Sequence, residues 1–317
     1  MGKRIPILTQ KQVMANFPKR PQDSHKGMFG NVAVIGGAAG TVGAALLAAR
    51  AALKLGAGCV HAGLLADNAP SVDPVQPELM LRKAHDLLHP LPNPLGETTS
   101  HSTRLHTTAA KSLVIPRAGE GANVKDNFNV LVIGCGMGIS NEAHKLLYEA
   151  LKSRSPVLLD ADALNLLARH TDLQDDLCSR KAATVLTPHP GETARLLGCE
   201  TGEVQADRVA VVQKLAQKFG CSVVLKGASS LCATCDGRLF MNKTGNPGMS
   251  AAGMGDVLAG MIAAFIAQGM SADDALLLAV HLHGAAGDAL AQQHAAIGMT
   301  ATEVTEWARW LLNQWLR

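Results

Sequence analysis

Residues 253–256, Gly-Met-Gly-Asp, place two glycines and one carboxylate where a helix is expected to begin. Apolar residues recur at helical spacing from Val257 onward, and Gly269 is a suitable helix stop. Free backbone N–H groups at a helix N-terminus can bind an anion, and glycines let a phosphate approach closely. The Asp256 carboxylate would then act as general base for a hydroxyl that attacks the phosphate, although aspartate is also a common helix N-cap.

A second glycine-rich turn, Gly-Cys-Gly-Met-Gly at residues 134–138, follows a predicted strand, and Asp160 lies at the end of the next one. A glycine turn with a downstream acid is typical of dinucleotide binding, in which the acid contacts a ribose. The spacing fails because the third required glycine falls at Ile139. A nicotinamide-dependent oxidoreductase therefore remains an alternative function.

Two further strand ends carry polar side chains. In residues 187–192, Thr-Pro-His-Pro-Gly-Glu, prolines flank His189 and hold the imidazole near a strand end, where it either contacts a ligand or is polar surface. Lys226 ends another strand and either joins a nucleotide site or is a solvated lysine in an ordinary turn. The small residues after it, whose amides and hydroxyls can surround a nucleotide, are Gly227, Ala228, Ser229 and Ser230.

Short β-type runs alternate with helix-type runs, which predicts an α/β fold with a mostly parallel central sheet and helices on both faces. The predicted strands are residues 31–37, 130–134, 156–162, 183–189 and 221–227. Residues 43–58 are predicted to be a helix that ends at its glycines, and Asp236-Gly237 the turn of a hairpin. Residues 85–127 are predicted to be a loop insertion in a single domain. Ligands gather at the carboxyl ends of such strands, where the motifs above lie.

The composition excludes several classes of protein. The net charge is +3, from 29 basic and 26 acidic residues that are scattered along the chain, so no nucleic-acid partner is expected. The longest apolar run, residues 257–267, is shorter than a membrane-spanning helix of about 20 residues, and the start of the chain lacks a secretion-signal pattern. We therefore expect a cytoplasmic protein without a membrane partner. The seven cysteines, with Cys232 and Cys235 in a single CxxC, are expected to be reduced, and no metal ligand is predicted.

Five segments, in this order, resemble one known family. They are HKGMFGNVAVIGGAAGTVGAALLAARAALKLGAG, DADALNLLA, TPHPGETARLLG, VVLKGASSLCA and GNPGMSAAGMGDVLAGMIAA, which together extend over about residues 25–290. The chain resembles the ADP- or ATP-dependent NAD(P)H-hydrate dehydratases of the ribokinase-like superfamily. The resemblance implies a single ribokinase-like domain over residues 1–317.

The resemblance also implies a repair reaction. NADH or NADPH hydrated at C6 of the nicotinamide ring is restored after a nucleotide phosphate is transferred to the C6 hydroxyl and then eliminated. By the same resemblance bacterial members use ADP, with AMP and phosphate as products, and eukaryotic members use ATP. We expect ADP to be preferred over ATP here, with Mg²⁺ accompanying the nucleotide. Asp256 corresponds to the base. Gly253, Met254 and Gly255 correspond to the anion hole; Lys226, Gly227, Ala228, Ser229, Ser230 and Gly255 to the nucleotide site; and Ala44, Gly136, His189 and Asp256 to substrate contacts.

The sequence departs from the family pattern in places. The usual Gly-Pro-Gly-Leu-Gly turn is Gly-Cys-Gly-Met-Gly at residues 134–138, and an alanine, Ala252, replaces one glycine before the base. Many bacterial relatives carry an N-terminal epimerase domain, and we expect that activity from a separate chain here. We also expect a homo-oligomer. An ATP-dependent kinase of a small vitamin precursor and a noncatalytic nucleotide-binding module remain alternatives.

Overall fold

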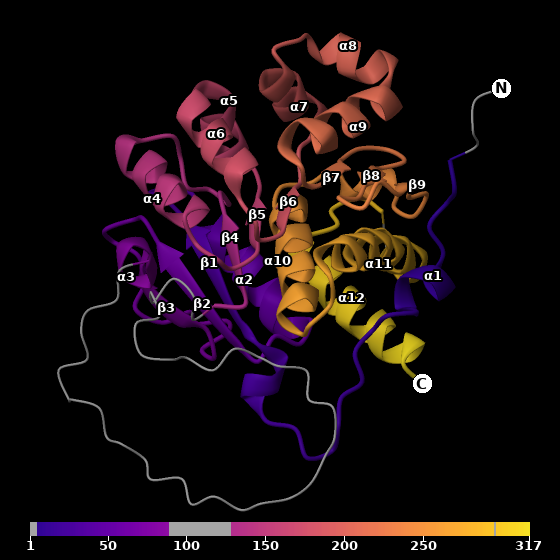
Figure 1. Cartoon of the computed structure of the whole chain (residues 1–317). Coiled ribbons are helices and arrows are strands. Elements are labelled where there is room, and N and C mark those ends of the chain that lie inside the picture. The colour runs from indigo at the N-terminus through magenta and orange to yellow at the C-terminus, as the bar shows by residue number, and fades with distance from the viewer. Residues whose placement is uncertain (1–4, 89–127, 295) are drawn as a thin grey trace, which may run out of the picture.

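The computed structural model describes residues 5–88, 128–294 and 296–317, and a single sheet organises them (Figure 1). The sheet has nine strands in the order β3-β2-β1-β4-β5-β6-β7-β8-β9. Their bounds are β1 Asn31–Gly36, β2 Cys59–Leu64, β3 Met80–Lys83, β4 Val130–Ile133, β5 Val157–Leu159, β6 Thr184–Leu186, β7 Ser222–Leu225, β8 Leu231–Ala233 and β9 Leu239–Met241. The five predicted strands are all present, although each is shorter than its apolar run suggested. β2 and β3 were not predicted.

The strands from β3 to β7 pair in parallel, and β8 and β9 add an antiparallel hairpin at the edge. The predicted turn is confirmed, because Gly237 has a φ of +90° and its N–H donates to the Thr234 carbonyl. The hairpin interrupts the βα alternation next to the loop that follows Lys226. The predicted mostly parallel sheet is therefore confirmed.

Helices cover both faces of the sheet, as predicted. The helices of the described residues are α1 Gln10–Met14, α2 Val42–Lys54, α3 Ala84–Leu88, α4 Asn141–Leu151, α5 Asp162–Arg169, α6 Thr171–Ser179, α7 Pro190–Leu197, α8 Thr201–Ala206, α9 Arg208–Phe219, α10 Met254–Ala267, α11 Ala272–Gln293 and α12 Ala301–Trp315. Strand periodicity divides the core: Val32 and Val34 pack with α2, α10 and α11, while Ala33 and Ile35 pack with α4 and α5 on the opposite face.

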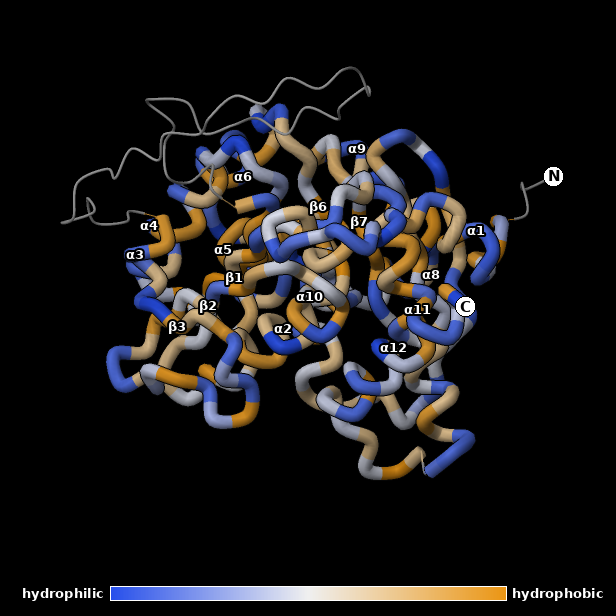
Figure 2. The backbone as a smooth tube through the Cα atoms, turned by 90° about the horizontal axis from the view of Figure 1, so that it is seen from below, coloured by the Kyte–Doolittle hydropathy of each residue, from blue (hydrophilic) through white to orange (hydrophobic). Residues whose placement is uncertain are grey.

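Helix α10 lies at the centre of the molecule, beside α11 and near the sheet (Figure 1). Its residues from Val257 to Ala267 are all buried, and hydrophobic segments surround it in Figure 2. A side chain at Gly260 would place Cβ only 2.1 Å from the Ala48 carbonyl oxygen, so α2 and α10 touch backbone to backbone. This close packing fixes the N-terminus of α10, where the predicted site begins.

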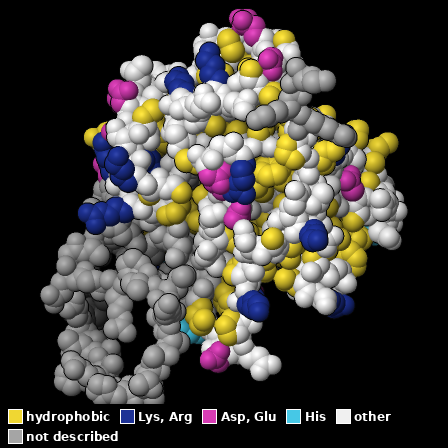
Figure 3. Space-filling model, turned by 45° about the vertical axis from the view of Figure 1, so that its right-hand side comes forward, with side chains coloured by type: hydrophobic (Ala, Val, Ile, Leu, Met, Phe, Trp, Pro, Cys, Tyr) yellow, Lys and Arg dark blue, Asp and Glu magenta, His cyan; other side chains and the backbone are white. Residues whose placement is uncertain are grey.

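The predicted loop insertion at residues 85–127 lies mostly outside the described residues, and so do His89, His101 and His106. Residues 85–88 belong instead to α3, where Leu87 and Leu88 are buried in the core. Within the described ranges, no helix is long and apolar enough to span a membrane. Lysine and arginine side chains are scattered over the face shown in Figure 3.

Candidate active site

The N-terminus of α10 has the predicted form. Gly253 is the N-cap residue with a φ of +87°, Met254 begins the helix, and Asp256 lies in the first turn. The helix ends at Ala267, with Gln268 as its C-cap residue, and Gly269 follows with a φ of +98°, as the sequence indicated. Because the cap is a glycine, Asp256 is not the N-cap, and that alternative is wrong. Asp256 remains available for chemistry.

Two buried groups surround the Asp256 carboxylate. Cys135 lies in the turn after β4, and Asp160 follows β5. The Cys135 Sγ, an Asp160 carboxylate oxygen and an Asp256 carboxylate oxygen all lie within 4.8 Å of one another. Burial, followed by the nearby Asp160 carboxylate, raises the pKa of Asp256 to about 6, while a hydrogen bond with the Cys135 thiol opposes the rise. A carboxylate with such a pKa is a stronger base than ordinary aspartate and is still ionised at neutral pH.

Lys226 lies beneath the same helix terminus. Its Nζ donates to Asp160 Oδ1 at 2.8 Å, and a Cβ at Gly255 would lie 3.2 Å from Nζ and 3.4 Å from Asp160 Oδ2. Burial alone would lower the pKa of Lys226, but the facing carboxylates of Asp160 and Glu192 outweigh it and raise that pKa. The alternative of a solvated lysine is therefore wrong. The ion pair also engages the Asp160 carboxylate, which the dinucleotide hypothesis required for a ribose.

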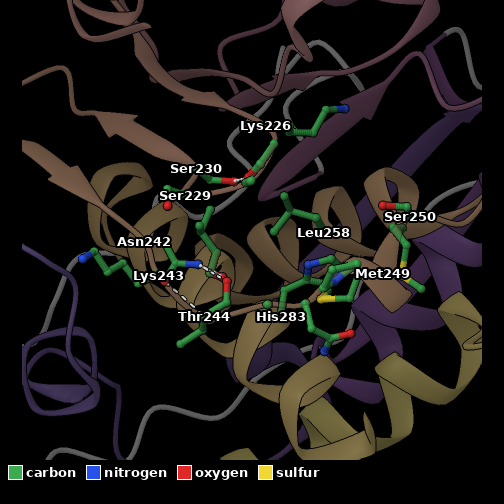
Figure 4. Close-up of a pocket in the computed structure, with 18 of the residues that line it drawn as sticks. Lys226, Ser229, Ser230, Asn242, Lys243, Thr244, Met249, Ser250, Leu258 and His283 are labelled. Carbon is green, nitrogen blue, oxygen red and sulfur yellow. Dashed lines mark hydrogen bonds between the residues drawn. The ribbon is translucent and has the colours of Figure 1, made fainter. Parts of the chain in front are cut away.

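A cavity of about 570 Å³ opens beside this terminus, between the β7–β8 turn, the segment after β9, and helices α10 and α11 (Figure 4). All six residues predicted for the nucleotide site line it, and so does Met254. The lining is Lys226, Gly227, Ala228, Ser229, Ser230, Asn242, Lys243, Thr244, Gly245, Asn246, Pro247, Met249, Ser250, Met254, Gly255, Leu258, Val280, His283 and Gly284. Figure 4 shows the Lys226 side chain extending away from Ser229 and Ser230.

His189 is held by a capping arrangement at α7. Its Nδ1 accepts from the N–H groups of Gly191 at 3.0 Å and Glu192 at 3.3 Å, and Glu192 Oε2 accepts from the His189 N–H at 2.7 Å. Burial, then Lys226, lowers the pKa of His189, so the imidazole is neutral at neutral pH. Burial raises the pKa of Glu192 to about 7. Helix capping therefore fixes His189 in addition to the prolines.

Ala44 and Gly136, two of the predicted substrate contacts, lie against each other. Gly136 has a φ of +59°, and a Cβ there would be 3.0 Å from the Ala44 Cβ and 2.6 Å from the Thr41 carbonyl oxygen. Thr41 Oγ1 donates to the Gly136 carbonyl at 2.8 Å. The structure therefore brings two predicted substrate residues into contact, although neither they nor His189 line the 570 Å³ cavity.

Sequence reasoning missed several parts of the site. Residues 245–250 form a loop that lies in one of the segments that resemble the family, but the sequence predicted no role for it. The Asp288 carboxylate on α11 fixes the loop, because it accepts from the Gly245 N–H at 2.8 Å and from Asn246 Nδ2 at 3.2 Å. His283 in the cavity wall was also missed. No short sequence motif marks Asp288 or His283, because both lie on α11, far along the chain from the loop and the strand ends that they approach.

The donor atoms near Asp256 do not fit a protein-held Mg²⁺ ion. Mg²⁺ requires oxygen ligands in nearly octahedral geometry. Of the three clustered residues, Asp160 already accepts from Lys226. Burial, followed by the Asp256 carboxylate, raises the pKa of the Cys135 thiol well above its ordinary value, so this sulfur keeps its proton.

Comparison with known proteins decides the family. A family model described as NAD(P)H-hydrate dehydratase matches residues 32–309. The chain belongs to the NAD(P)H-hydrate dehydratase family. It is 40% identical to the ADP-dependent (S)-NAD(P)H-hydrate dehydratase of Neisseria meningitidis, over 94% of this chain and 90% of that protein. It is 37% identical to the bifunctional NAD(P)H-hydrate repair enzyme Nnr of Coxiella burnetii, over 97% of this chain but only 55% of that protein.

Two solved structures agree with the fold. The ADP/ATP-dependent NAD(P)H-hydrate dehydratase of Bacillus subtilis, co-crystallised with ATP and Mg²⁺, superposes with a TM-score of 0.79 at 27% identity, covering 99% of this chain and 100% of that one. A ribokinase-like superfamily protein of Enterococcus faecalis gives a TM-score of 0.77 at 25% identity, covering 98% and 96%. The predicted ribokinase-like fold is confirmed.

Proposed function

We propose that the protein catalyses the nucleotide-dependent dehydration of the (S)-hydrate of NADH or NADPH, with ADP as the preferred phosphate donor. The observation that carries the proposal is the N-terminus of α10, where Gly255 lines the nucleotide-sized cavity and Asp256, next in the chain, has a pKa of about 6 raised chiefly by burial. One helical turn thus joins an anion-binding backbone to a base.

The proposed first step is phosphoryl transfer. Asp256 accepts the proton of the C6 hydroxyl as its oxygen attacks the β-phosphorus of ADP, and the bond from that phosphorus to the bridging oxygen breaks, releasing AMP. The N–H groups at residues 253–255 stabilise the transferred phosphoryl group, and the positive end of the α10 dipole adds to this. Mg²⁺ would be held by the nucleotide phosphates and water, since the side chains clustered at Asp256 do not fit it.

The proposed second step is elimination. The C6–O bond breaks with its electron pair and phosphate leaves, water takes up a proton from the neighbouring ring carbon, and the electrons of that C–H bond restore the double bond of the dihydronicotinamide. We assign the substrate side of the site to Ala44, Gly136 and His189, on the basis of the resemblance and of the contact between Ala44 and Gly136. A neutral His189, whose position is fixed by capping, can orient the substrate without opposing the charge on Lys226.

The test is recovery of NADH absorbance from the purified hydrate, with ADP and ATP supplied in separate reactions. We expect faster recovery with ADP. Turnover with ATP and none with ADP would contradict the nucleotide assignment, and a stable phosphorylated vitamin precursor as the only product would identify a kinase instead. Binding of nucleotide without any product would identify a noncatalytic module.

The relatives bear on the supply of substrate. The chain spans about half the length of several bifunctional relatives, including 55% of the Coxiella burnetii protein. We propose that an epimerase activity separate from the domain described here converts the other hydrate epimer to the (S) form. Without an epimerase, a mixture of both epimers should yield only as much NADH as it contains (S)-hydrate. Addition of an epimerase should raise that yield to the total amount of hydrate.

A further inference from the structure

His283 is a buried imidazole in the wall of the cavity. It lies on α11, where Val280, His283 and Gly284 face the cavity at helical spacing. Only 9% of the residue is exposed. Figure 4 shows it across the cavity from Ser229 and Ser230. The proposed nucleotide would therefore lie between the β7–β8 turn and this side chain.

The Nε2 atom of His283 is buried and has no hydrogen-bond partner among the residues that the structure describes. A buried polar atom without a partner destabilises a fold, so such atoms are rare unless a ligand or water satisfies them. His281, two residues earlier on α11 and also buried, shows the ordinary arrangement, because its Nδ1 lies 3.3 Å from Asn242 Oδ1. Of these two buried histidines on α11, only the one that lines the cavity has a buried nitrogen without a partner among the described residues.

The imidazole of His283 is uncharged at neutral pH. Burial, and secondarily the charge of Lys226, lowers its pKa to about 4. A neutral imidazole has one N–H donor and one acceptor nitrogen. It can therefore hydrogen-bond a ligand oxygen without the desolvation cost that a buried cation would carry. The N-terminus of α10, at Met254 and Gly255, supplies positive potential to the cavity wall.

We propose that His283 is a nucleotide-binding residue whose Nε2–H donates to an oxygen of the bound nucleoside diphosphate. This inference rests on the proposed function, because it takes the cavity to be the ADP site. The acceptor is a ribose hydroxyl or a phosphate oxygen, both of which are oxygen acceptors that a neutral N–H donor suits. His283 thereby completes the α11 side of a site whose other walls come from the β7–β8 turn and α10.

The experiment measures ADP binding by calorimetry and melting temperature without ligand, for wild type, His283→Leu and His283→Asn. Leucine is apolar and removes the unpaired nitrogen, so the ligand-free melting temperature should stay the same or rise. The dissociation constant for ADP should increase about tenfold, equivalent to about 1.4 kcal/mol. Asparagine keeps an N–H donor and should recover part of that affinity. Unchanged ADP affinity in both variants would overturn the proposal.

The matched control is His61→Leu, because His61 Nδ1 on β2 is also buried with no hydrogen-bond partner in the described part of the chain, but does not line the cavity. This variant should bind ADP as wild type does; an equal loss of affinity would mean that the effect is a general one on the fold and would overturn the proposal. Adenosine and AMP separate the two acceptors: weakened adenosine binding indicates the ribose, and weakening limited to AMP and ADP indicates a phosphate. A wild-type protein that binds ADP but restores no NADH would refute the dehydratase function alone.

Discussion

Replacement of Asp256 by asparagine should abolish most activity without unfolding the protein. Asparagine has nearly the same size but cannot accept the hydroxyl proton, and loss of a general base reduces turnover by roughly 100-fold or more. Gly253, not Asp256, caps α10, so the helix start does not depend on the carboxylate. ADP affinity should change little, since Asp256 does not line the nucleotide-sized cavity.

The same substitution should leave the stability unchanged or increase it. The pKa of Asp256 is raised by burial from 3.8 to about 6, so the folded state holds its proton more tightly than the unfolded state. Stability from this group is complete below pH 3.8 and is lost as pH rises to about 6. The ionised carboxyl then costs at most about 3 kcal/mol at neutral pH, less where solvent screens it. Asparagine removes that cost.

Two assays check this reasoning. The rate of NADH recovery gives turnover against pH, and wild type should lose activity as pH falls below about 6, because Asp256 takes up a proton there. Thermal unfolding gives stability, and the advantage of the variant should grow between pH 4 and 6 and then level off, as expected for a pKa near 6. Near-normal turnover with a clear fall in melting temperature would show that Asp256 is structural and that another group is the base.

Three other substitutions test the surroundings of the base. Lys226→Met should weaken ADP binding and also lower the melting temperature, because it leaves the buried Asp160 carboxylate without its partner, at a cost of about 3–5 kcal/mol of stability. The double variant with Asp160→Asn should regain stability. If the two substitutions instead cause additive losses of stability in calorimetry, the pairing is contradicted. Cys135→Ala should move the acidic limb of the pH–rate profile upward, since the thiol hydrogen bond lowers the pKa of Asp256, and an unmoved limb would show that the thiol has no such effect. Gly260→Ala should lower the melting temperature by several degrees, because its Cβ would lie 2.1 Å from a backbone oxygen of α2. An unchanged melting temperature in calorimetry would mean that α2 and α10 move apart at little cost.

The elements of the fold could be predicted where the signal is local. Strands buried on both faces appear as short apolar runs, which is why β1, β4, β5, β6 and β7 were found. β2 was missed because Cys59–Leu64 contains His61 and follows directly on a glycine, and β3 was missed because Met80–Lys83 at the sheet edge is half polar. An edge strand needs no continuous apolar run, so composition does not reveal it.

The candidate site could be predicted only in part. The anion hole and Asp256 follow from a helix start with glycines, and the small residues after Lys226 follow from a strand end. The sequence left Lys226 open between a nucleotide contact and a solvated turn. Its ion pair could not be predicted, because the Asp160 partner lies 66 residues away in the chain. Substrate roles for Ala44 and Gly136 came only from the family resemblance and stay predictions.

By itself the sequence determined the features that depend on a few consecutive residues. These are the start of α10 at Gly253 and its stop at Gly269, where only glycine adopts a positive φ without strain, and the turn of the hairpin at Gly237. Tertiary structure decided the pairing of Lys226 with a carboxylate on a neighbouring strand, and the position of His283 in the cavity wall. Strand order and helix packing bring these groups together, and both arise from contacts summed over the whole core, which no short stretch of sequence contains.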